Sequence, residues 1–137
     1  MSIPLQPERL RIVRPEKTKD GVVVLALSGE LDAGTTPKLS SALVQMLDSG
    51  PETLVLDLSG LSFMSVAGGR SIRLTHDAAG ATRLRVVTGS CRTVDLVLHA
   101  TGLAAVLDCY PTRSEALTAG SRKQFLSDAE ACWNLDR

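Results

Sequence analysis

Residues 22–58 read VVVLALSGELDAGTTPKLSSALVQMLDSGPETLVLDL, and this stretch decides the fold. The runs Val22–Ser28 and Thr53–Leu58 are rich in β-branched residues and leucine, which is typical of buried strands. Between them, Thr36-Pro37 predicts the start of a helix, with threonine as the N-cap and proline at the first helical position. Gly50-Pro51 ends that helix. A strand, a helix and a second strand at this spacing predict a βαβ unit with parallel strands.

The rest of the chain extends this pattern in both directions. It predicts a single α/β domain with a mixed, mostly parallel β-sheet and about four α-helices packed on it. A hairpin at Asp20-Gly21 adds an antiparallel edge strand. Further strands are expected over Leu10–Arg14, Leu84–Thr88 and Val106–Tyr110, and loops over Gly29–Gly34 and Ser59–Ser65. One helix is expected from the end of the second loop to about Ala79 and another over Arg92–Ala100. A last helix opens with the capping box Thr112-x-x-Glu115.

Two extensions flank the domain, which we expect to span residues 10–120. Residues 1–9 contain Pro4 and Pro7 and predict a flexible N-terminal extension. Residues 121–137 predict a helical C-terminal extension, because apolar residues recur there at helical spacing: Phe125, Leu126, Ala129, Cys132 and Trp133. This extension is typical either of an extra helix packed on the domain or of a contact with a partner or a second copy, since tryptophan is a frequent interface anchor.

Composition excludes several classes of protein. The 137 residues carry 15 basic and 15 acidic side chains, so the net charge gives no reason to expect nucleic acid or an anionic membrane as a partner. No apolar run approaches the roughly 18–20 residues that span a bilayer, and the N-terminus lacks the apolar core of a secretory signal. The three cysteines, without a C-x-x-C spacing, are typical of reduced thiols in the cytoplasm.

No catalytic or metal-binding constellation stands out. His76 and His99 are isolated, and the chain contains neither an H-E-x-x-H nor a G-x-S-x-G motif. Gly68-Gly69-Arg70-Ser71 lacks the longer loop and the lysine of a phosphate-binding loop, so its glycines indicate a helix start packed close to a strand or a partner. Cys91, in a predicted first helical turn, is either a thiol of lowered pKa or a small buried side chain. We therefore expect no catalytic residues, no metal and no cofactor, and a protein that binds rather than catalyses.

The segment that follows Leu58 is unusual in a different way. An apolar Phe63-Met64 pair comes after the strand, and small residues then open a helix. Exposed Met64 and Val66 beside Gly68 and Gly69 would form a flat apolar patch at a helix N-terminus, which a protein partner could approach closely. The alternative is that Phe63 and Met64 plug the end of the sheet.

Three segments resemble the STAS family, which includes the anti-sigma-factor antagonists. Leu27–Asp32 followed by Thr36-Pro37 is similar to its first motif, and Leu54–Met64 is similar to its second. The stretch Arg92–Leu103, ending in Thr-Gly-Leu, is similar to the third helix of the family and its exit. The resemblance covers about residues 8–120, with the segments in the right order, and implies a STAS-like fold.

For a small member of this type, the resemblance implies an antagonist that binds an anti-sigma factor, often a serine kinase of the GHKL type, and thereby releases a sigma factor. In the family, the kinase phosphorylates a serine at the start of the second helix, which breaks the complex. The physics is consistent, because a phosphate adds about −1.5 to −2 charges that a packed interface cannot desolvate without an opposing group.

This sequence departs from the family pattern at that serine. The family usually has Phe-x-Asp-Ser-Ser-Gly-Leu, whereas this chain has Phe63-Met64-Ser65-Val66-Ala67-Gly68-Gly69. Val66 stands where the family has its phosphorylated serine and has no hydroxyl. Three interpretations follow: constitutive binding controlled by expression level, Ser65 as an alternative acceptor, or a module that has moved to another partner. Ser65 is also a candidate N-cap of the helix.

The predicted partner-binding residues are Asp32, Ser62, Met64, Ser65, Val66, Gly68 and Gly69. For Asp32 the alternative is a loop residue that turns the backbone before a helix. The expected partner is an anti-sigma factor of the GHKL-type serine kinase class, with a homodimer kept as an alternative. An alternative function is a STAS module that senses a small ligand or assembles into a larger signalling complex.

Overall fold

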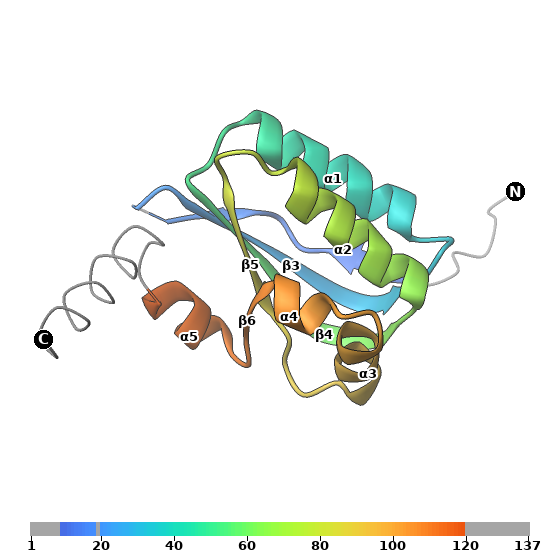
Figure 1. Cartoon of the computed structure of the whole chain (residues 1–137). Helices are drawn as coiled ribbons and strands as arrows, with labels where there is room; N and C mark the ends of the chain where they lie inside the picture. Colours follow the sequence, from blue (N-terminus) through green and yellow to red (C-terminus); the bar gives the residue numbers. More distant parts are fainter. Residues whose placement is uncertain (1–8, 19, 120–137) are drawn as a thin grey trace, which may run out of the picture.

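The computed structural model describes residues 9–18 and 20–119, which form a six-stranded mixed sheet (Figure 1). The strand order is β1-β3-β4-β5-β6, and β2 also pairs with β3. The N-terminal strands β1 and β2 run antiparallel to β3, whereas β3, β4, β5 and β6 are parallel. The predicted mixed, mostly parallel sheet with an antiparallel edge is therefore confirmed. The strands are β1 (Leu10–Ile12), β2 (Glu16–Lys17), β3 (Val22–Leu31), β4 (Thr53–Met64), β5 (Arg83–Val87) and β6 (Asp108–Tyr110).

Five helices connect or follow the parallel strands in the described part of the chain. Figure 1 shows α1 and α2 side by side, and both begin at the same end of the sheet. This arrangement follows from two consecutive βα units, because each helix starts where its parallel strand ends. The helices are α1 (Thr36–Asp48), α2 (Val66–Ala78), α3 (Arg92–Ala100), α4 (Leu103–Val106) and α5 (Arg113–Thr118).

The core has two parts, one on each face of the sheet. In β4, Leu54 and Leu56 point to the larger cluster, which includes residues of α1, α2, α3 and α4. Val55 lies between them in sequence and points to the smaller cluster, in which Ala116 of α5 covers the other face. The alternation of side chains along a strand places these residues on opposite faces. All four are fully buried.

The predicted loop over Ser59–Ser65 is wrong, because β4 continues to Met64, and the predicted loop over Gly29–Gly34 is wrong at its start, because β3 continues to Leu31. Two bulges allow this. Leu27 faces both Leu58 and Ser59, and Ser62 is an extra residue between the pairs Gly29–Leu61 and Glu30–Phe63. Each bulge adds one residue to β4. As a result the buried residues recur at every third position, at Leu58, Leu61 and Met64, a spacing that hides the strand from pattern analysis.

The predicted last strand over Val106–Tyr110 is wrong in its first half. Gly102, with φ 76°, turns the chain into the short helix α4, and Leu103 of that helix is buried in the core. The left-handed backbone conformation at this position favours glycine. Only Asp108–Tyr110 forms β6. Thr112 accepts a hydrogen bond from the backbone of Glu115 at 3.2 Å, which confirms the predicted cap of α5.

The two predicted extensions lie almost entirely outside the described residues. Arg9 is the exception: its carbonyl oxygen accepts a hydrogen bond from the backbone of Glu30. The C-terminal extension over 121–137, with Cys132 and Trp133, is not among the described residues.

Candidate functional site

The two segments that carry the sequence motifs lie side by side at the carboxyl ends of β3 and β4. Leu31, at the end of β3, pairs with Met64, at the end of β4. The backbone N–H of Ser65 then donates to the carbonyl of Leu31 at 2.8 Å. The starts of α1 and α2 follow directly, so the loop after β3 and the first turn of α2 form one continuous edge of the molecule. Ligands of parallel α/β sheets commonly bind at such edges.

Asp32 organises the turn that leads into α1. Its Oδ1 atom accepts the backbone N–H groups of Gly34 at 2.9 Å and Thr35 at 3.1 Å. Its Oδ2 atom lies 2.6 Å from Nη1 of Arg9, which fixes the carboxylate from outside. The turning role proposed for Asp32 is thus present in the structure. The N-cap of α1 is Thr35, one residue before the predicted Thr36, and its hydroxyl donates to the carbonyl of Glu30 instead of capping the helix.

Ser65 caps α2, as the sequence predicted. Its hydroxyl oxygen accepts the backbone N–H of Gly68 at 3.2 Å, and its backbone is extended. The next residue, Val66, begins the helix and is 47% exposed. An apolar side chain therefore faces solvent at the position where the resemblance places the phosphorylated serine.

Met64 is not part of an exposed patch, because its side chain is only 1% exposed and packs in the core, as in the alternative interpretation for this residue. The second bulge of β4 reverses the expected alternation, so Met64 plugs the sheet end while Phe63 is 41% exposed. Phe63 was not among the predicted site residues, and no signal in the sequence reveals the bulge that turns it outward.

Gly68 and Gly69 are buried and do not contribute to an exposed patch. A Cβ atom on Gly68 would lie 2.8 Å from Cγ and 3.0 Å from the carbonyl oxygen of Leu31. On Gly69 it would lie 3.1 Å from Val97 and 3.2 Å from Leu103. The glycines let α2 pack tightly against the end of β3 and against α3 and α4, which confirms their expected role at a closely packed helix start.

The exposed and half-buried side chains of this edge form a small mixed surface. We call it the strand-end surface and define it as Asp32, Ser62, Phe63, Ser65 and Val66. Two of its members, Phe63 and Val66, are exposed apolar side chains, and the other three are polar. Protein-binding sites commonly combine apolar and polar groups. Of the predicted partner-binding residues, Asp32, Ser62, Ser65 and Val66 come together here, whereas Met64, Gly68 and Gly69 support them from below.

Other candidate groups lie elsewhere. His99 contacts the carbonyl of Asp95 within its own helix, and His76 contacts the neighbouring Asp77. Cys91 is the N-cap of α3 and so directly precedes the first helical turn in which it was expected, and its hydrogen bond with Thr93 lowers the pKa of the thiol. Within residues 9–18 and 20–119, no three His, Cys, Asp or Glu side chains are arranged to hold a metal ion. No helix in the same ranges is long and apolar enough to cross a membrane.

Replacing Ser65 with alanine is expected to lower the free energy of unfolding by about 1 kcal/mol, because α2 loses its N-cap. Ser65→Asp is the matched control, since an aspartate caps a helix N-terminus as well as serine does. Urea unfolding of both variants measures the effect. Equal stability of Ser65→Ala and wild type would contradict a capping role.

Comparisons with known proteins agree with this geometry. The STAS domain model matches residues 15–116. Anti-sigma-F factor antagonist RsfA of Mycobacterium tuberculosis is 31% identical over 106 residues, which cover 73% of this chain and 80% of that protein. The crystal structure of an anti-sigma factor antagonist from Mycobacterium paratuberculosis is 29% identical, with a TM-score of 0.71 and coverage of 83% of this chain and 96% of that one.

A third similar protein is the anti-sigma factor antagonist SpoIIAA, whose structure in its unphosphorylated form is 25% identical, with a TM-score of 0.57. That match covers 78% of this chain and 93% of SpoIIAA. The order of the strands, the two motif segments at one edge and these matches lead to one conclusion. The chain belongs to the STAS domain family, and its relatives include anti-sigma factor antagonists.

Proposed function

We propose that this protein is an anti-sigma factor antagonist, which binds an anti-sigma factor of the GHKL-type serine kinase class through the strand-end surface. The observation that carries the proposal is the juxtaposition of Asp32, at the end of one motif, with Phe63 and Val66, at the end of the other. Two half-exposed apolar side chains on a rigid sheet end provide the anchors that protein interfaces use. Binding would occur in the cytoplasm and release a sigma factor.

In this proposal, phosphorylation of residue 66 does not control binding. Val66 accepts no phosphate, and its exposed isopropyl group favours an apolar contact with the partner. Ser65 remains an alternative acceptor, although its hydroxyl oxygen is bonded to the N–H of Gly68. A phosphate on Ser65 would lie at the N-terminus of α2, where N–H groups and the helix dipole favour an anion.

Affinity capture from a lysate of the native cell, with ATP present and mass spectrometry as the readout, tests the proposed function. We expect enrichment of an anti-sigma factor with Ser65 unmodified. A phosphate on Ser65 would move the switch one residue along the chain. Capture without any anti-sigma factor, under conditions in which the bait is folded, would contradict the proposal.

The variant Val66→Ser is expected to become a substrate of the partner kinase at residue 66. The site is exposed, so the substitution itself should change stability by no more than about 0.5 kcal/mol. Phosphorylation then places about −1.5 to −2 charges on the strand-end surface and should release the partner. Mass spectrometry after incubation with kinase and ATP measures incorporation, with Val66→Ala as the control. No incorporation by a kinase that modifies a reference substrate would show that more than the acceptor has been lost.

A further inference from the structure

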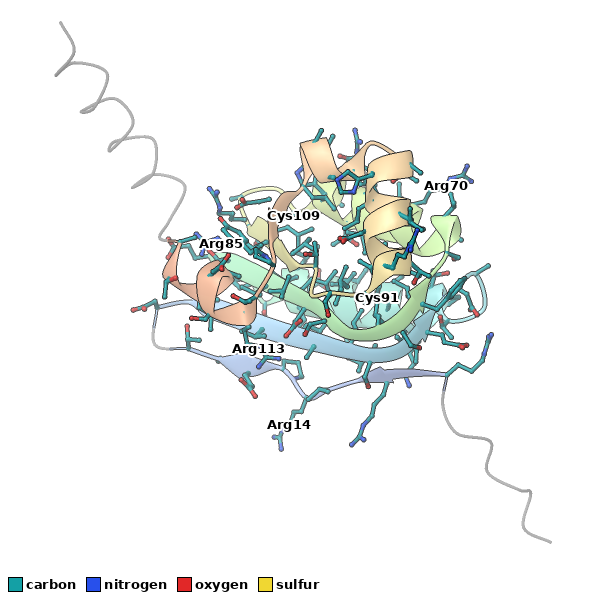
Figure 2. All side chains as sticks on the ribbon, turned by 90° about the horizontal axis from the view of Figure 1, so that it is seen from below. Arg14, Arg70, Arg85, Cys91, Cys109 and Arg113 are labelled. Atoms are coloured by element: carbon teal, nitrogen blue, oxygen red, sulfur yellow. The ribbon has the colours of Figure 1, made fainter. Side chains whose placement is uncertain are left out.

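Helix α5 is fastened to the sheet by polar contacts more than by apolar ones. Its one buried residue is Ala116. Arg113, at its start, reaches Asp57 of β4, and Arg85 of β5 donates from Nη1 to the carbonyl of Ala116 at 2.8 Å. Figure 2 shows Arg85 and Arg113 near α5, whereas Arg70 of α2 lies far from it in that view.

Asp57 contacts both Arg113 and the backbone of β4. Its Oδ2 atom accepts a hydrogen bond from Nε of Arg113 at 2.9 Å and forms an ion pair with Nη2 of the same residue, also at 2.9 Å. Its Oδ1 atom accepts the backbone N–H of Ser59 at 2.9 Å and the Ser59 hydroxyl at 2.6 Å. Burial opposes ionisation, but these contacts outweigh it and lower the pKa of the Asp57 carboxyl. The carboxylate is therefore charged at neutral pH and has a partner on each oxygen.

Ser59 lies at the first bulge of β4. Leu58 and Ser59 together face the single residue Leu27, so the regular ladder has one residue too many on the β4 side at this point. The carboxylate of Asp57 takes up the Ser59 N–H at this irregularity. A bulge changes the direction and twist of its strand. The five residues after Ser59 lead to Ser65, so the geometry of this bulge sets where the strand-end surface lies.

We propose that Arg113 is a positioning residue for the strand-end surface. It fixes Asp57, Asp57 holds the bulge at Ser59, and the bulge orients the end of β4 with Ser62, Phe63 and Ser65. Helix α5 is thereby coupled to Ser59 by hydrogen bonds through Asp57, and from Ser59 to the surface by the backbone of β4. That this surface binds a partner rests on the proposed function, whereas the coupling between Arg113 and the surface does not.

Nuclear magnetic resonance on the full chain tests the coupling without a partner. Arg113→Met keeps the aliphatic stem and removes every donor. We expect amide hydrogen exchange at Ser59 to rise at least about tenfold, with chemical-shift changes at Ser62 and Ser65. The exchange rate of the Val55 amide, in the regular part of β4, should stay in the same ratio to the rates of the rest of the sheet as in the wild-type protein. Arg113→Lys, which retains a charged donor, should restore part of the protection.

Glu16→Gln is the matched control. Glu16 is a second carboxylate near Arg113, with Oε2 at 3.7 Å from Nη1, and its loss leaves the contact with Asp57 in place. This variant should leave Ser59, Ser62 and Ser65 unchanged. The coupling is overturned if Arg113→Met gives the same spectra as Glu16→Gln in this region, or if exchange at Val55 rises by the same factor as at Ser59.

Binding of the captured anti-sigma factor then separates the two proposals. We expect Arg113→Met to weaken that binding about tenfold, with Glu16→Gln equal to wild type. An undiminished affinity of Arg113→Met, together with altered shifts at Ser62 and Ser65, would overturn the positioning role. Wild-type protein that binds no anti-sigma factor would refute the proposed function, and the spectra would still decide whether the coupling exists.

Discussion

Replacing Val66 with aspartate is expected to weaken the affinity for the anti-sigma factor by about 30-fold or more, while the fold stays intact. Val66 is 47% exposed at the first position of α2, so a charged side chain is hydrated in the free protein. In the complex the same charge would lie within the strand-end surface, in place of an apolar contact. Loss of a central anchor typically costs about 2 kcal/mol or more, which corresponds to this factor.

The matched control for this experiment is Leu74→Asp. Leu74 lies on the same helix, is 69% exposed, and is separated from Val66 by eight residues, or about 12 Å of helix. It should bind the anti-sigma factor as wild type does. Isothermal titration with the three proteins gives the affinities, and circular dichroism verifies the fold. If both substitutions weaken the affinity equally, or if neither weakens it, the interface lies elsewhere.

The second large effect is expected at Gly68, where alanine should destabilise the protein by about 1–3 kcal/mol. Its Cβ atom would lie 2.8 Å from Cγ of Leu31 and 3.0 Å from the carbonyl oxygen of the same residue. That carbonyl also accepts the N–H of Ser65, so the backbone cannot move away without loss of the contact that joins β3 to the start of α2. Overpacking at such a site exceeds the gain of about 1 kcal/mol from a better helix former.

Gly69→Ala provides the comparison for the same substitution one residue later. There the new methyl group would meet two side-chain methyl carbons, Cγ1 of Val97 and Cδ1 of Leu103, at 3.1 and 3.2 Å, and not the backbone of β3. These side chains adjust at little cost, and the helix gains propensity, so the stability should stay within about 1 kcal/mol of wild type. Urea unfolding measures both variants. A Gly68→Ala protein as stable as Gly69→Ala would show that the close packing against Leu31 does not constrain α2.

Local patterns in the sequence predict the elements whose cause is local. The apolar runs of β3 and β4 and the N-caps Ser65 and Thr112 depend on neighbouring residues, and the structure confirms them. The end of β4 is different, because the two bulges arise from pairing with β3. The three-residue spacing of Leu58, Leu61 and Met64 differs from the two-residue alternation of a regular strand, so the sequence did not predict a strand there.

The candidate site is predictable in part for the same reason. The residues Asp32, Ser65 and Val66 were predicted through the resemblance to the STAS motifs, and the parallel strands bring the two motif segments together. The burial of Met64 and the exposure of Phe63 depend on a bulge that no local signal reveals. The contact between Asp57 and Arg113 joins residues 56 positions apart, and only the tertiary structure shows it.

The measurement that tests the central claim most directly is displacement of a sigma factor. Fluorescence anisotropy of a labelled sigma factor, bound to the captured anti-sigma factor, is followed while this protein is added. We expect the anisotropy to fall to the value of the free sigma factor with wild-type protein, and to stay high with Val66→Asp at the same concentrations. Unchanged anisotropy at saturating wild-type protein would contradict the proposed antagonist function.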